Sequence, residues 1–171
     1  METIKRAKLK SRNDELGMWL EMATVRALEN IPLLVTKQSQ FNEFYQQDRA
    51  QGPDVLFEFG DDKIGCIECK NVNKDFIISQ NWFKNSVDHR FFPEKGVRKH
   101  AYDGLAAYIV VMSHFKASPQ SLVPKLRRKY RLFDLGFQIT NQETYEAAIP
   151  IIEKYLRMLT EWLKNNSTGS N

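Results

Sequence analysis

Two acidic residues and a lysine have types and a spacing that suit metal chemistry: Asp54, Glu68 and Lys70. The segments 54–59 and 63–70, on either side of a Gly-Asp-Asp tripeptide, are typical of a β-hairpin. With a three-residue loop, Asp54 falls directly opposite Glu68, and Lys70 lies on the same face. Facing carboxylates repel each other unless a cation binds between them, and Mg²⁺ prefers one or two such ligands. The spacing therefore predicts a Mg²⁺ site with a lysine beside it.

The other face of this hairpin is predicted to be a core face, because its side chains are apolar. They belong to Val55, Phe57, Phe59, Ile67 and Cys69. The carboxylates and the lysine are therefore expected together on an exposed face at one end of the hairpin. The alternative is that Glu68 and Lys70 form only a solvated ion pair at a strand end. Cys66 and Cys69 should point to opposite faces of the strand, so neither a zinc site nor a redox dithiol is expected.

The hairpin carries a motif that resembles the signature of the PD-(D/E)xK nuclease superfamily. Pro53-Asp54 is followed, after thirteen residues, by Glu68-Cys69-Lys70. The resemblance covers about 17–112 and includes the order of elements, namely a helix bearing a glutamate, the hairpin, a further helix and another strand. It implies an α/β fold of the restriction-endonuclease-like class, with a central mixed β-sheet flanked by helices.

The resemblance also implies a role for each residue of the motif. Asp54 and Glu68 would be metal ligands, and the backbone carbonyl of Cys69 would be a further one. Lys70 would position or activate the attacking water. The implied cofactor is Mg²⁺, with Mn²⁺ as a substitute. No phosphate-binding GxxxxGK[ST] loop occurs in the sequence, so no nucleotide cofactor is expected.

A fourth catalytic residue is expected on the first helix, predicted over 13–29. At about 100° per residue, its apolar side chains form one stripe. They belong to Leu16, Leu20, Ala23 and Ala27. Glu21 lies on a mainly apolar arc, where an acidic group needs a partner or a metal. Its spacing from Gly17 also resembles the helix of the family, so Glu21 is expected to bind a metal-held water or a second metal. The alternatives are that Glu21 is an ordinary helix glutamate whose head group reaches solvent, and that Glu15 is the helix carboxylate of the site.

The rest of the chain is predicted to alternate between strands and helices, as in an α/β or α+β fold. We expect an edge strand at 31–36, a short helix at 76–90, a buried strand at 107–112, a basic helix at 121–132, a short strand at 137–139 and a last helix from a capping box at 140–143 to about Lys164. A single nuclease domain is expected over residues 1–164, with a flexible tail at 165–171.

The charge of the chain points to a polyanionic partner. The formal net charge is +4, and the basic residues are clustered, which suits DNA phosphates, although a merely solvated face is the alternative. Contacts with nucleic acid are expected from Lys74, Lys84, Arg90, Arg98 and Lys99. Trp82 and Phe83 are expected to pack in the core rather than stack on bases.

The function expected from the resemblance is that of a metal-dependent DNA endonuclease, similar to archaeal Holliday junction resolvases or archaeal-virus nucleases and acting as a homodimer. A restriction-type or mobile-element endonuclease is an alternative. A DNA-binding module without catalysis, and a structural protein whose C-terminal helix forms an oligomer interface, are alternatives of other classes. With no long apolar run and no secretory signal, the protein is expected in the cytoplasm and not in a membrane.

Overall fold

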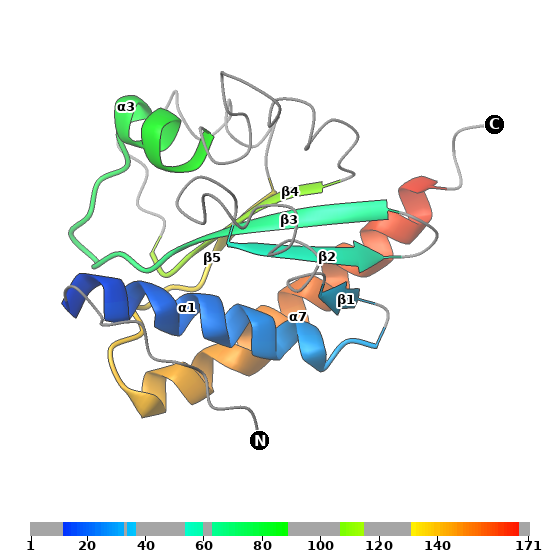
Figure 1. Cartoon of the computed structure of the whole chain (residues 1–171), viewed down its shortest axis with the longest axis horizontal. Helices are drawn as coiled ribbons and strands as arrows, with labels where there is room; N and C mark the ends of the chain where they lie inside the picture. Colours follow the sequence, from blue (N-terminus) through cyan, green and yellow to red (C-terminus); the bar gives the residue numbers. More distant parts are fainter. Residues whose placement is uncertain are drawn as a thin grey trace, which may run out of the picture.

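A mixed β-sheet forms the centre of the protein (Figure 1). The computed structural model describes residues 12–32, 34–36, 54–59, 63–88, 107–114 and 131–167. The five strands lie side by side in chain order: β1 (Leu34–Thr36), β2 (Val55–Phe59), β3 (Lys63–Lys70), β4 (Ala107–Met112) and β5 (Arg131–Asp134). The first three strands pair antiparallel, whereas β3, β4 and β5 are parallel. The predicted α/β class with a central mixed sheet is confirmed.

The β2–β3 hairpin has the register that was predicted from its sequence. Phe59 pairs with Lys63 and Val55 pairs with Ile67, so three residues separate the two strands. Asp54 directly precedes Val55, and Glu68 directly follows Ile67, so the register continues to a position where Asp54 is opposite Glu68. A shift by one residue would have moved every side chain to the other face of the sheet.

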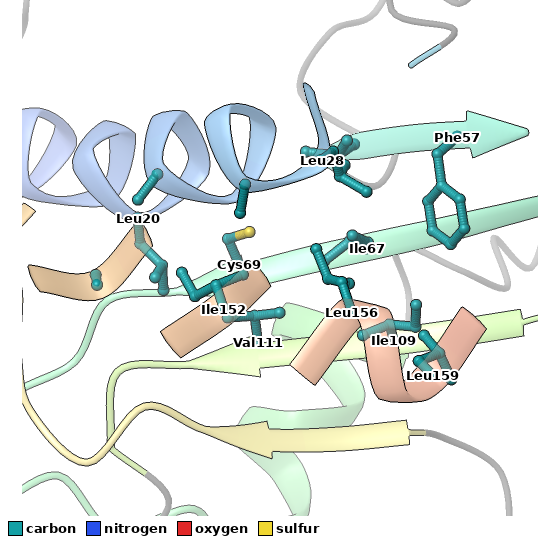
Figure 2. Packing of buried hydrophobic residues seen from close by; sticks show 14 of the residues in the cluster. Leu20, Leu28, Phe57, Ile67, Cys69, Ile109, Val111, Ile152, Leu156 and Leu159 are labelled. Atoms are coloured by element: carbon teal, nitrogen blue, oxygen red, sulfur yellow. The ribbon is translucent and has the colours of Figure 1, made fainter. Parts of the chain in front are cut away.

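Two helices, α1 (Arg12–Glu29) and α7 (Gln142–Ser167), cover one face of the sheet (Figure 1). The predicted stripe of α1 is confirmed for Leu20, Ala23 and Ala27, which are fully buried in the core, whereas Leu16 is half-buried. Figure 2 shows this core, which includes Leu20, Leu28, Phe57, Ile67, Cys69, Ile109, Val111, Ile152, Leu156 and Leu159. The predicted core face of the hairpin is thus the face that these two helices cover.

The C-terminal helix α7 covers the core with Ile152, Leu156, Leu159 and Leu163, while Trp162 remains 43% exposed. Asn141 caps it: the Thr144 N–H donates to Asn141 Oδ1 at 2.9 Å, and the Asn141 N–H donates to Thr144 Oγ1 at 3.1 Å. The predicted capping box therefore begins one residue later than expected. The helix also continues past Lys164 to Ser167. In the part of the chain that the structure describes, no helix has the length and apolar character needed to span a membrane.

The opposite face of the sheet is covered by a short helix, α3 (Gln80–Phe83), and a π-helical turn, η1 (Lys84–Asp88). A second buried cluster lies there, made of Cys66, Ile78, Phe83, Val87, Val110 and Met112. The prediction that this face of the hairpin is exposed is therefore wrong, because α3 and η1 close over it. Cys66 and Cys69 do lie on opposite faces of β3, as predicted.

The predictions for the segment before α7 are wrong. Arg131–Asp134 is a strand, β5, which pairs parallel with β4, whereas a helix was expected to reach residue 132. The strand expected at 137–139 is absent, since these residues have no regular structure. Residues 115–130, which hold the rest of the expected basic helix, lie outside the described residues.

Gly65→Ala is expected to lower the free energy of unfolding by about 1–3 kcal/mol, because it overpacks the core. Gly65 pairs with Phe57, and a methyl group at this position would collide with the Phe57 ring. Urea denaturation monitored by circular dichroism measures the change. Gly17→Ala is the matched control: nothing lies near its new methyl group, and alanine favours the helix, so this variant should gain about 0.5–1 kcal/mol. Equal stability of the two variants would contradict the prediction.

Candidate active site

The candidate site lies where β3 ends, beside the start of β2. Asp54 immediately precedes β2, and its Oδ2 accepts a hydrogen bond of 2.7 Å from the backbone N–H of Cys69. A hydrogen bond from the main chain to a carboxylate is charge-assisted and strong. It therefore fixes the carboxylate of Asp54 against the last residues of β3, where Glu68 and Lys70 are found.

Glu68 and Lys70 form an ion pair on the face that α3 and η1 cover. The Lys70 Nζ donates a hydrogen bond to Glu68 Oε1. The side chain of Glu68 is 1% exposed, whereas that of Lys70 is 20% exposed, so Lys70 is the more exposed partner of the pair. A buried carboxylate of this kind is stable only with a cation nearby. The predicted solvated pair at a strand end is therefore not what the structure shows.

The α1 helix brings a third carboxylate to this place. The pKa of Glu21 is raised from its ordinary value of 4.5 to about 7, chiefly by burial and also by the charge of Asp54, while the charge of Lys70 opposes the rise. These electrostatic interactions require Glu21 to lie near both residues. Glu21 thus lies near Asp54 and Lys70, while the side chain of Glu15, the alternative, lies outside the described residues.

The cysteine of the motif takes part through its main chain only. Its thiol is buried in the core under α1, where Sγ lies 3.5 Å from Thr24 Oγ1, and burial raises the pKa of this thiol well above its usual range. A neutral, buried thiol is a poor metal ligand and a poor nucleophile. Cys69 can therefore serve the site through its backbone N–H, which holds Asp54, and through its backbone carbonyl.

The donor atoms gathered here suit a hard divalent cation. Glu21, Asp54 and Glu68 offer carboxylate oxygens, and Asp54 already raises the pKa of Glu21, as expected for crowded like charges. Among the described residues, no three His, Cys, Asp or Glu side chains form a ready metal-binding group. A Mg²⁺ ion is usually held by only one or two carboxylates, with water and phosphate oxygens completing its shell. The residues present therefore fit Mg²⁺ better than zinc.

Two residues that the sequence did not single out as site residues anchor the chain directly after Lys70. Asn71 makes hydrogen bonds to α1 and to the segment before α7. The buried Ser113, after β4, accepts a hydrogen bond of 2.7 Å from the Val72 N–H and donates one of 2.6 Å to the Val72 carbonyl. The position of Asn71 directly after the motif could have indicated its importance. Nothing in the sequence indicates the role of Ser113, because its partner Val72 is distant in sequence.

The residues expected to contact nucleic acid are only partly described. Lys74 and Lys84 are exposed, and both follow β3. Arg90, Arg98 and Lys99 lie outside the described residues. Packing of the two aromatic residues is confirmed: Phe83 is buried, and Trp82 is half-buried with its ring edge-on to Phe76, the ring centroids being 4.7 Å apart.

Comparison of the chain with protein-family models, with curated proteins and with solved structures found no match. The interpretation of the site therefore depends on its own geometry. That geometry consists of the Glu68–Lys70 ion pair, the hydrogen bond from the Cys69 N–H to Asp54, and Glu21 on α1, whose pKa responds to Asp54 and Lys70.

Proposed function

We propose that this chain is a metal-dependent DNA endonuclease of the PD-(D/E)xK type, with a restriction-endonuclease-like fold. The observation that carries the proposal is the meeting of Glu21, from α1, with Asp54 and Lys70 at one end of the hairpin. These residues are far apart in sequence, and the ion pair of Lys70 adds Glu68 to the group. An ordinary solvated face does not bury one carboxylate and raise the pKa of another beside it.

Each residue has a defined task in phosphodiester hydrolysis. Asp54 and Glu68, with the Cys69 carbonyl, would hold Mg²⁺ or Mn²⁺. The cation would supply neutralisation of phosphate charge and a lower pKa for a bound water. Lys70, the more exposed partner of the ion pair, would donate a hydrogen bond to that water or to a phosphate oxygen. Glu21 would accept a hydrogen bond from the water on the α1 side.

The substrate is proposed to be DNA, bound by phosphate contacts that include the exposed Lys74 and Lys84. A structure-selective nuclease of the Holliday junction type, acting as a homodimer, is the form of the proposal that the resemblance favours. A restriction-type or mobile-element endonuclease would use the same residues. The substrate panel below distinguishes these roles.

Asp54→Asn and Glu68→Gln are expected to reduce DNA cleavage at least about 10²-fold, because each replaces a metal-binding carboxylate by a neutral group of the same shape. The assay uses labelled linear duplex, single strand, flap and four-way junction, each with Mg²⁺, Mn²⁺ or EDTA. Glu161→Gln, an exposed glutamate on α7, is the matched control and should cut like the wild type.

Two results would count against this function. Cleavage that persists in EDTA, or that survives in Glu68→Gln with a folded circular dichroism spectrum, would exclude Glu68 as a metal ligand. DNA binding without cutting under any metal would exclude catalysis and favour the DNA-binding module. Preference for the four-way junction would support the resolvase role over the restriction-type role.

A further inference from the structure

The residue directly after Lys70 joins three parts of the chain. Asn71 Nδ2 donates hydrogen bonds to the Leu16 carbonyl at 2.5 Å and to the Ile139 carbonyl at 2.8 Å. Its Oδ1 accepts a hydrogen bond of 3.1 Å from the Ile139 N–H. The amide therefore donates two hydrogen bonds and accepts one, whereas an ionised carboxylate has no donor and a hydroxyl has only one. Asn71 connects β3 to α1 and to the segment that leads into α7.

The bond to α1 is made close to the site. Leu16 and Glu21 lie on the same helix, less than two turns apart. Among the described residues, α1 also packs against β3 through apolar side chains and through the weak thiol contact of Cys69 with Thr24. Apolar packing is not directional, so it leaves a helix some freedom to slide along a sheet. A hydrogen bond from a side chain to a helix carbonyl removes that freedom.

Two neighbouring hydrogen bonds thus set the positions of two carboxylates relative to β3. The Cys69 N–H fixes Asp54, and the Asn71 amide fixes α1 and with it Glu21. We propose that Asn71 is a positioning residue, which holds α1 in register so that Glu21 stays beside Asp54 and Lys70. This inference rests on the proposed function, because it assigns Asn71 its role through Glu21 in that site.

A double-mutant cycle of Asn71→Ala and Glu21→Gln tests the proposal. Asn71→Ala is expected to lower kcat about 10-fold with little change in KM for DNA, and to weaken Mn²⁺ binding, measured by electron paramagnetic resonance, by a similar factor. In the Glu21→Gln background, Asn71→Ala should cause no further loss in either quantity, because the residue through which it acts has already been changed.

Asn30→Ala is the matched control for a loss of anchoring of α1. Asn30 follows α1 at the end away from the site, where its Nδ2 donates to Glu153 Oε2 at 3.0 Å and its carbonyl accepts from Arg157 at 2.9 Å. This variant should lose stability without losing kcat or Mn²⁺ affinity. If Asn71→Ala does not fold, Asn71→Ser, which keeps a hydroxyl for one of the bonds, takes its place.

The outcomes separate this proposal from the function on which it rests. Wild-type protein that neither binds Mn²⁺ nor cuts DNA overturns the proposed function, and this inference with it. Wild-type cleavage together with wild-type kcat and Mn²⁺ affinity in Asn71→Ala overturns the positioning role alone. Losses from Asn71→Ala and Glu21→Gln that multiply also overturn it, because the two residues would then act independently.

Discussion

Lys70→Met is expected to lower the free energy of unfolding by about 3 kcal/mol at pH 7.5. The substitution keeps the length and apolar stem of the side chain but removes the ammonium group that donates to Glu68. Because Glu68 is almost completely buried, its charge then remains in the interior without this cation, and breaking such a pair from one side is strongly destabilising. Urea denaturation in EDTA measures the change.

Two further variants test the physical reason for this loss. Lys74→Met removes the charge of an exposed lysine and should change stability by less than about 0.5 kcal/mol. Glu68→Gln combined with Lys70→Met should recover part of the loss, because no buried charge is left. If the double variant were less stable than Lys70→Met alone, desolvation of Glu68 would not be the cause.

Glu21→Gln is expected to stabilise the metal-free protein above pH 7. The pKa of Glu21 is about 7 in the folded protein and 4.5 ordinarily, so the folded state binds the proton more tightly. Stability of the wild type therefore falls as pH rises from about 4.5 to 7, and stays low above that range. Each pKa unit corresponds to about 1.4 kcal/mol, so the variant should gain about 1–3 kcal/mol at pH 8 and almost nothing at pH 4.

Urea denaturation in EDTA at a series of pH values measures this dependence. Glu29→Gln, an exposed glutamate on the same helix that pairs with Arg26, is the control and should show no comparable gain at pH 8. A gain that is equal at pH 4 and pH 8 would show that ionisation of Glu21 does not destabilise the folded protein. If Glu21→Gln is more stable than the wild type but binds metal more weakly, Glu21 serves function at the expense of stability.

The hairpin and its carboxylates could be predicted from the sequence because their determinants are local. Alternation of side chains over 54–59 and 63–70 allowed only one register that buries Val55, Phe57 and Ile67 together. The helical stripe of α1 was local in the same sense, because the burial of Leu20, Ala23 and Ala27 follows from their helical spacing. The register alone predicts that Asp54, Glu68 and Lys70 lie together at one end of the hairpin, and this prediction needs no knowledge of the other strands.

The errors concern contacts between distant segments. Burial of the Glu68 face depends on α3 and η1, which fold back over the sheet, and no local pattern indicates which face a short helix will cover. The strand β5 is stabilised by parallel pairing with β4, whereas its own sequence follows a basic segment typical of a helix. The hydrogen bonds of Asn71 could not be predicted, because its partners Leu16 and Ile139 lie 55 and 68 residues away.

The packing of α1 against α7 has a consequence for how the chain folds during its synthesis. The hydrogen bond between Asn30 and Glu153 joins residues 123 positions apart, and the two helices together cover one face of the sheet. The hairpin can form as soon as it leaves the ribosome, but its core face stays uncovered until α7 has also emerged. During that interval the nascent chain carries an apolar sheet face that can associate with other chains or with chaperones. Refolding yield should therefore fall with protein concentration much more steeply than the stability of the finished fold would suggest.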